Sequence, residues 1–169
     1  MKKKFVTLVA TMASLALVVG LIAGPATGAK STKKQSIADI ASGSKQFETL
    51  TSLLAQADLV ETLDGKGKFT VFAPTDAAFA KVPQSTLDGL AANPEQLKAV
   101  LLYHVASGRL TARKVVRRSS IKTLNGASVK VRVTKKGVRV NDARVIKADV
   151  RAKNGVIHAI DGVLLPPSN

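Results

Sequence analysis

The spacing of the apolar residues changes near Gly108, and this change limits the folds that the chain can adopt. Before Gly108, apolar side chains recur mostly at helical spacing, whereas after it they alternate with polar side chains. Val129, Val131 and Val133 alternate with basic or polar residues, and the turn signal at 135–137 predicts a hairpin. Helices in the first half and strands in the second predict an α+β domain with a mostly antiparallel sheet.

Local signals predict several helices in the first half. Ser36 followed by Asp39 predicts a capping box ahead of a short helix. Ser44 is expected to cap a longer helix that continues to the turn cluster at 64–67. Asn93, which is followed by a proline, predicts the N-cap of a further helix that ends near the histidine at 104.

In the segment 69–73, apolar residues fall on both faces of an extended chain, which predicts a short strand buried on both faces. Pro74 ends this strand, and Thr75 or Asp76 is expected to cap a short helix. Asp76 and Asp161 are the acids best placed to suggest catalysis, but no second carboxylate shares a face with either. We interpret Asp76 as a helix cap and Asp161 as a strand-end or turn residue.

Residues 1–29 have the composition of an export signal. The lysines at 2–4 precede an uncharged, largely apolar run at 5–24, and small residues follow it. We predict cleavage after Ala26 or Ala29, which makes the mature protein secreted or loosely associated with the envelope. The alternative is an uncleaved anchor, because the apolar run is nearly long enough to span a bilayer.

Residues 30–35 read as a polar linker, and 36–167 as a single domain without repeats. After the leader, no segment is apolar enough to predict a transmembrane span. The chain contains no cysteine, which excludes disulfides, a thiol nucleophile and a cysteine-containing metal site.

The net charge of +15 is concentrated in one part of the chain. Residues 30–108 carry eight basic and eight acidic residues, whereas 109–153 carry fifteen basic residues against Asp142 and Asp149, a net charge of +13. Such a segment favours anionic partners. Five of its basic residues lie on the predicted hairpin: Lys130, Arg132, Lys135, Lys136 and Arg139.

Two interpretations of this basic hairpin remain open. It is either a site for anionic cell-wall polymers, extracellular polysaccharide or phospholipid headgroups, or a solvated surface that limits aggregation. Nucleic acid is the weakest anionic candidate, because no aromatic residues are interleaved with the basic ones.

The chain has two histidines, His104 and His158, and both fall on predicted apolar faces. We expect both to be buried, with ring nitrogens bonded to backbone or hydroxyl groups rather than to a metal. Tyr103 is expected at the flank of the apolar stripe that contains His104.

Three segments resemble the signature of the fasciclin (FAS1) family. They are the strand and helix at 69–79, the Tyr103-His104-Val105 motif, and the closing segment at 154–166. The resemblance implies a wedge of two β-sheets with helices packed along one edge. We expect no cofactor. It also implies an extracellular adhesion or binding role without catalysis.

The resemblance also assigns positions to individual residues. Tyr103 and His104 match a motif linked to integrin binding in animal members, and they carry over as positions only. Thr75, Asp76, His158 and Asp161 fall within the two longer segments as structural positions. Some members carry carotenoids, so an extracellular carrier of an apolar small molecule is the alternative function.

Overall fold

A computed structural model of the chain describes residues 34–167. The predicted export signal and both cleavage positions lie outside the described residues, as does most of the predicted linker. Within 34–167, no helix has the length and apolar character needed to cross a bilayer.

Helix α1 (Ile37–Ser42) begins as the sequence predicts. The Ser36 hydroxyl accepts a hydrogen bond from the backbone N–H of Asp39 (3.1 Å), and the Asp39 carboxylate accepts one from Ser36 N–H (2.9 Å). This reciprocal pair satisfies two backbone donors that the first helical turn leaves without partners. The hydrogen bonds from Ser36 also lower the pKa of the Asp39 carboxyl.

The predicted long second helix is wrong, because two helices occupy this stretch. Helix α2 spans Glu48–Gln56 and helix α3 spans Val60–Asp64. Asp58 separates them with φ of 55°, a left-handed conformation that stops a right-handed helix. Ser44 does not cap α2; its carbonyl accepts a hydrogen bond from Phe47 N–H in the turn before the helix.

The other helices are α4 (Asp76–Phe79), α5 (Gln84–Ala92), α6 (Pro94–Tyr103) and α7 (Ala112–Val115). Proline takes the first position of α6, as predicted, but the Asn93 side chain does not cap this helix. Instead its Nδ2 donates to the carbonyl of Gly89 (2.9 Å), which closes the end of α5. The side chain therefore terminates the preceding helix.

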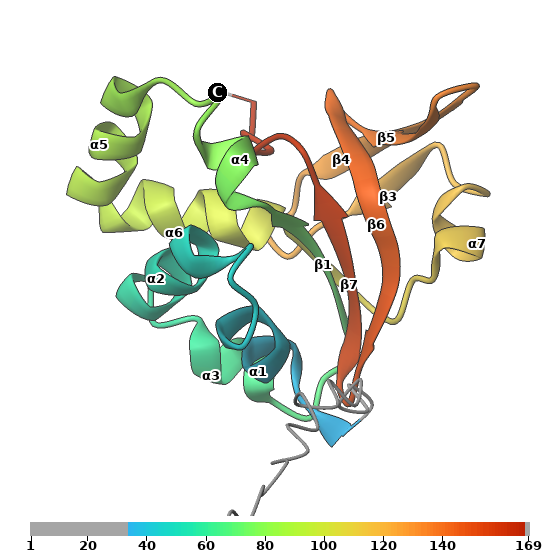
Figure 1. The fold of residues 1–169 in the computed structure, drawn as a ribbon, viewed down its shortest axis with the longest axis horizontal. Helices are drawn as coiled ribbons and strands as arrows, with labels where there is room; N and C mark the ends of the chain where they lie inside the picture. The colour runs from blue at the N-terminus through green and yellow to red at the C-terminus, as the bar shows by residue number, and fades with distance from the viewer. Residues whose placement is uncertain (1–33, 168–169) are drawn as a thin grey trace, which may run out of the picture. The chain divides into compact units, whose positions relative to one another are not determined.

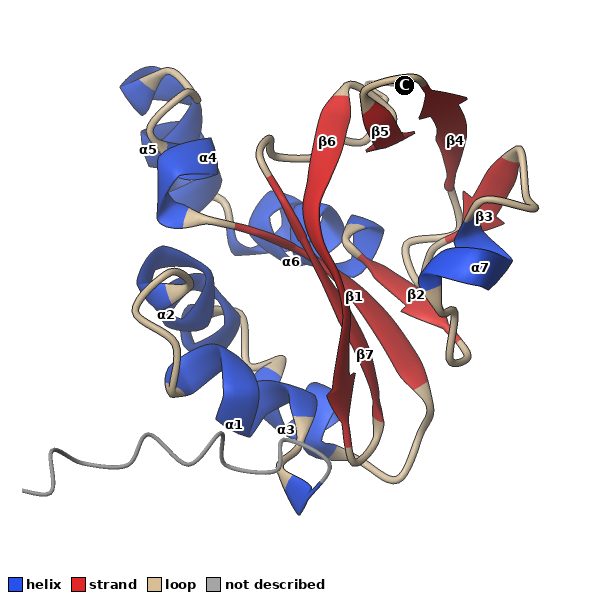
Figure 2. Ribbon diagram, turned by 45° about the vertical axis from the view of Figure 1, so that its right-hand side comes forward, coloured by secondary structure: helices blue, strands red, loops and turns tan. Residues whose placement is uncertain are grey.

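Seven strands form one mixed sheet in the order β2-β1-β7-β6-β5-β4-β3 (Figures 1 and 2). The strands are β1 (Phe69–Pro74), β2 (Val105–Ser107), β3 (Ser120–Lys122), β4 (Ser128–Thr134), β5 (Gly137–Val140), β6 (Ala143–Ala152) and β7 (Gly155–Ile160). Only β1 and β7 pair in parallel, and the other pairs are antiparallel.

The sheet curls until its two ends meet. A bridge between Ala106 of β2 and Thr123, just after β3, joins the two outermost strands. Helices α1–α6 lie along the side of β1 and β7, whereas β3–β6 and α7 form the other half (Figures 1 and 2). The α+β class, with helices packed along one edge of a β wedge, is confirmed, and the two expected layers are the two halves of one curled seven-stranded sheet.

Strand β1 separates two hydrophobic cores, as its apolar sequence predicts. Val71 belongs to the core that the helices cover, and Phe72 belongs to the core enclosed by the β half. Next to β1, the backbone of β7 approaches so closely that a Cβ on Gly155 would overlap the carbonyl oxygen of Phe69. Glycine at this position therefore permits the parallel pairing of β1 with β7.

Candidate functional site

A row of three arginines crosses the middle strands of the β half. Arg132 on β4 is paired directly with Arg139 on β5, and Arg139 is paired with Arg144 on β6. Directly paired residues project from the same face of a sheet, so the three side chains share the outward face. All three are exposed. We call this set the arginine row.

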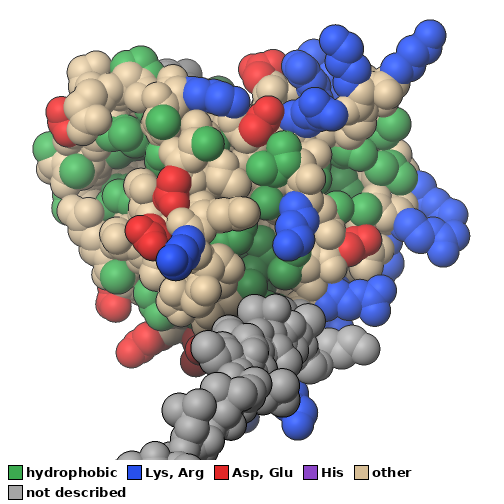
Figure 3. Space-filling model, in the orientation of Figure 1, with side chains coloured by type: hydrophobic (Ala, Val, Ile, Leu, Met, Phe, Trp, Pro, Cys, Tyr) green, Lys and Arg blue, Asp and Glu red, His purple; other side chains and the backbone are tan. Residues whose placement is uncertain are grey.

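The alternation that the sequence shows places the arginine row outward. Val129, Val131 and Val140 project to the opposite face and are buried in the core of the β half. Figure 3 shows Lys and Arg side chains gathered over the side of the molecule that carries these strands in Figure 1. Arg132 and Arg139 therefore lie opposite each other on one face of the predicted hairpin.

Arg144 was missed by sequence reasoning, although a signal for it was present. Asn141 and Asp142 form a two-residue turn between β5 and β6, and Asn141 adopts φ of 52°. Asn and Asp are favourable turn residues, and a two-residue turn at 141–142 predicts that Arg144 pairs with Arg139. A Cβ placed on Gly137 would lie 3.9 Å from Nε of Arg144, so the Arg144 side chain lies along β5.

The arginine row has no acidic partner among residues 34–167. Within these residues the single ion pair joins Lys81 to Asp161 at 3.9 Å. None of the three guanidinium groups donates a hydrogen bond to another described residue, whereas Arg109 donates to the Lys153 carbonyl at 2.9 Å. The described structure therefore leaves the donors of the arginine row to solvent or to a ligand.

The predicted lysines surround the β4 end of the row. Lys130 is exposed on β4, paired with Ser120, two positions before Arg132. Lys135 and Lys136 form the β4–β5 turn, as predicted. These lysines are also exposed, and they widen the positive surface at this end.

Tyr103 is buried, which its predicted place at the flank of the apolar stripe did not indicate. Its side chain is only 2% exposed because the end of α6 packs against the β half. The Tyr103 hydroxyl donates to the Ser128 carbonyl (3.3 Å) and accepts from Nδ2 of Asn141 (3.0 Å). Oδ1 of Asn141 accepts from Lys130 N–H (2.8 Å), so Tyr103 supports the strands beneath the basic face.

His104 is buried, as predicted, and its ring is held in one neutral form. Nδ1 lies 2.8 Å from the Val100 carbonyl and donates to it, while Nε2 accepts from Leu164 N–H at 2.9 Å. Burial lowers the pKa of His104 to about 4. A protonated ring would direct a second N–H at the Leu164 donor, so this site favours the neutral imidazole.

His158 is held in the same way with the two nitrogens exchanged. Nε2 donates to the Leu110 carbonyl (2.7 Å), Nδ1 accepts from Asp149 N–H (3.3 Å), and the ring stacks on Phe72. Burial lowers its pKa. All four ring nitrogens of the two histidines are thus bonded to the backbone. Within 34–167, no cluster of three His, Cys, Asp or Glu side chains is arranged to hold a metal.

Asp76 and Asp161, which lie in the segments that resemble the FAS1 signature, accept hydrogen bonds from backbone N–H groups. Oδ1 of Asp76 accepts a hydrogen bond from Thr49 N–H (2.9 Å), so the Asp76 side chain caps α2 and not α4. Thr75 occupies the N-cap position of α4 without such a bond. Asp161 follows β7, and its Oδ1 accepts a hydrogen bond from Arg144 N–H (2.7 Å). This bond connects the end of β7 to the start of β6.

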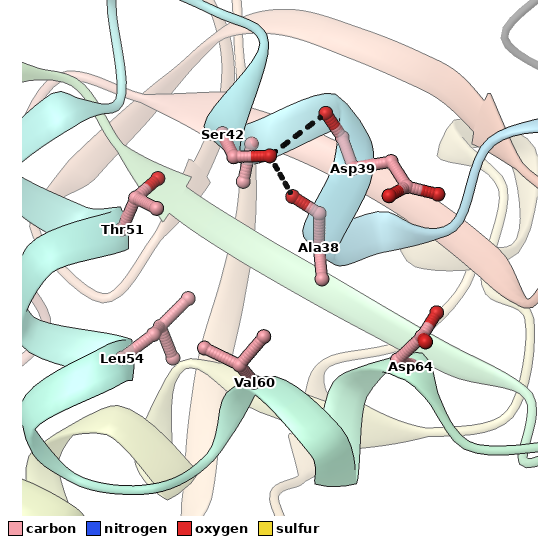
Figure 4. Close-up of a pocket in the computed structure, with 8 residues that line it drawn as sticks. Ala38, Asp39, Ser42, Thr51, Leu54, Val60 and Asp64 are labelled. Carbon is pink, nitrogen blue, oxygen red and sulfur yellow. Dashed lines mark hydrogen bonds between the residues drawn. The ribbon is translucent and has the colours of Figure 1, made fainter.

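A hollow of about 150 Å³ lies in the helical half, among α1, α2 and α3. Figure 4 shows that the Ser42 hydroxyl on its wall donates to the carbonyls of Ala38 and Asp39 in its own helix. Leu54 and Val60 supply much of the remaining wall. The Asp39 carboxylate accepts from Ser36 N–H and the Thr51 hydroxyl donates to the Phe47 carbonyl, which leaves Asp64 as a single carboxylate on the wall, so the hollow presents no converging set for chemistry.

The model of the Fasciclin domain family matches residues 45–166. "Protein sll1483" of Synechocystis is 45% identical over 133 residues, which cover 78% of this chain and 73% of that protein. "Immunogenic protein MPB70" of Mycobacterium bovis is 39% identical over 150 residues, which cover 86% and 76%.

A solved structure with the same fold is a FAS1 domain pair from the insect cell adhesion molecule Fasciclin I. It superposes with a TM-score of 0.66 at 20% identity, over 78% of this chain and 51% of that one.

Proposed function

Because the chain belongs to the fasciclin domain family, we propose that it is an exported, non-enzymatic adhesion or binding module. In this proposal its basic β half contacts anionic polymers of the cell envelope or the extracellular matrix. The adhesion role is supported by the similar fold of an insect cell adhesion molecule. Export is supported by the lysine-led apolar leader at 1–29.

The arginine row carries the proposal. Like charges directly opposed across strands destabilise a sheet by a few tenths of a kcal/mol per pair, and a bound anion removes that repulsion. Protection of a sheet edge does not account for the row, because Arg139 lies on β5, which has neighbours on both sides. A binding role explains why three like charges are aligned on interior strands.

The chemistry of the remaining polar groups supports binding without catalysis. Asp76 and Asp161 accept hydrogen bonds from backbone N–H groups, and both histidines do the same at one ring nitrogen. Groups held in this way stabilise the fold, and they are poorly placed to exchange protons with a substrate.

The alternative, carriage of an apolar small molecule, draws less support. Two larger hollows, of about 420 Å³ beside α5 and α6 and about 410 Å³ beside α4, are open surface depressions. A more apolar hollow, lined by Val115, Val138, Val145 and others, encloses about 20 Å³. That volume holds about one water molecule, whereas small-molecule sites typically enclose about 300 Å³ or more.

The test is binding to immobilised anionic wall polymer, heparin or anionic phospholipid across a salt gradient. For a polyanion site the logarithm of the affinity falls linearly with the logarithm of salt concentration. The triple variant Lys130→Gln, Arg132→Gln, Arg139→Gln should weaken binding and flatten that slope together.

The control is a triple variant in the charge-balanced half, Lys45→Gln, Lys66→Gln, Lys98→Gln. Lys81 is unsuitable as a control because its Nζ donates to the Asp161 carbonyl. If both triple variants weaken binding equally, the attraction is a net-charge effect and the basic face is not a site.

A further inference from the structure

We propose, on the basis of the proposed function, that the arginine row selects an acidic polysaccharide through paired arginine–carboxylate contacts. The polymer would run across β4, β5 and β6, and its carboxylates would meet Arg132, Arg139 and Arg144 in turn. The proposal adds Arg144 to the site and names the partner as a polyuronate rather than any polyanion.

The sheet sets the spacing of the row. Neighbouring strands lie about 4.8 Å apart, so the three arginines begin at intervals of that length over about 10 Å. One sugar unit of an extended uronate chain has a similar length. A carboxylate on each sugar, or on each second sugar when alternate units face away, falls within reach of a guanidinium.

The choice of side chain supports carboxylate recognition. All three members of the row are arginines, although lysines occupy the adjoining positions Lys130 and Lys135. A guanidinium presents two parallel N–H groups that match the two oxygens of a carboxylate, which an ammonium does not. No described residue accepts a hydrogen bond from these guanidiniums or lies within 4 Å as an acidic partner.

The arrangement of the row favours a linear partner over a flat membrane surface. Along β5 the positions two residues from Arg139 are Gly137 and Asn141, and neither is basic. Along β5, positive charge is therefore confined to Arg139.

Hydrogen bonds of Asn141 fix the position of the strands that carry the arginine row. Asn141 bonds Tyr103 of α6 through its amide nitrogen and Lys130 N–H through its amide oxygen. The turn between β5 and β6 is thus fixed to both the helical half and β4. A fixed backbone keeps the spacing of the arginines constant, which is needed for a ligand with a regular repeat.

The test compares Arg132→Lys, Arg139→Lys, Arg144→Lys with the corresponding triple Gln variant on the full mature chain. Probes are polygalacturonate, its fully methyl-esterified form, inorganic polyphosphate and anionic phospholipid vesicles. The control replaces three other exposed arginines of the basic half, Arg113, Arg117 and Arg151, with lysine. Thermal melts check that each variant is folded.

The expected result is that the row Lys variant binds polygalacturonate at least about fivefold more weakly, while the control Lys variant binds as the parent does. The methyl ester should not bind. Affinity for oligogalacturonates should rise steeply until the chain bridges Arg132 and Arg144, and only shallowly beyond that length.

Other outcomes separate this inference from the proposed function. If the row Gln variant loses binding and the row Lys variant keeps it, only charge is recognised: the inference fails and the proposed function stands. If neither row variant loses binding, both fail. Equal binding of the methyl ester, or tighter and equally arginine-dependent binding of polyphosphate or vesicles, would overturn the assignment to a polyuronate.

Discussion

The backbone N–H of Leu164 donates a hydrogen bond of 2.9 Å to Nε2 of His104, across sixty positions of sequence. This bond fastens the segment after β7 to the end of α6. Because the other ring nitrogen donates to Val100, the imidazole must be neutral and in one tautomer for both bonds to exist. The fold is therefore linked to the titration of a buried side chain.

Stability should fall as the pH decreases from about 6.5 to about 4. The folded-state pKa of His104 is about 4, below its ordinary 6.5, so the unfolded chain binds more protons in this window. The contribution is complete above pH 6.5, and its loss amounts to about 3 kcal/mol. His158, whose pKa is also lowered, acts in the same direction. Urea denaturation at pH 7.5 and 4.5 measures the change, and equal stability at both would contradict this account.

His104→Ala should lower the free energy of unfolding at pH 7.5 by about 1–3 kcal/mol. The substitution removes the partners of the Val100 carbonyl and Leu164 N–H, both of which lie in the interior. The variant should also lose less stability than the parent between pH 7.5 and 4.5, since one titrating group is gone. An unchanged pH dependence would assign the effect to other residues.

Tyr103→Phe should destabilise the chain by about 1 kcal/mol while leaving the core filled. The ring is retained, but Nδ2 of Asn141 loses its acceptor and the Ser128 carbonyl loses a donor. Chemical denaturation measures the loss, and amide hydrogen exchange should show faster opening at the β5–β6 turn. A loss of stability without faster exchange there would mean that Tyr103 acts through packing alone.

Gly155→Ala should destabilise by about 3 kcal/mol or more, because the added Cβ would overlap the Phe69 carbonyl and force β1 and β7 apart. Gly89→Ala is the matched control. Gly89 lies in α5, and apart from the backbone of its own helix nothing lies within 4 Å of an added Cβ, so alanine there should stabilise by about 0.5–1 kcal/mol. Thermal unfolding of the two variants decides whether the parallel pairing requires glycine.

The export signal predicts a mature N-terminus at Thr27 or Lys30. Intact-mass measurement of protein from the medium or a mild envelope wash should give one of these two masses. Full-length protein that detergent alone extracts would show that the leader is an anchor.

Several features follow from residues that are close in sequence, and these could be predicted. The Ser36–Asp39 capping box, the buried strand β1 and the β4–β5 hairpin each depend on a pattern within about ten residues. The three segments that resemble the FAS1 signature also allowed the fold class to be predicted. The pairing of Arg132 with Arg139 belongs here too, because a short turn sets the register.

Other features depend on contacts between distant segments, and only the tertiary structure decided them. Asp76 caps a helix 27 positions earlier, and Asn93 closes the helix before it. Tyr103 is buried because the β half covers the end of α6, which no helical periodicity within α6 can report. Local patterns state which groups need partners. The choice among partners depends on the free energy of packing the whole domain, which is a sum over contacts distant in sequence.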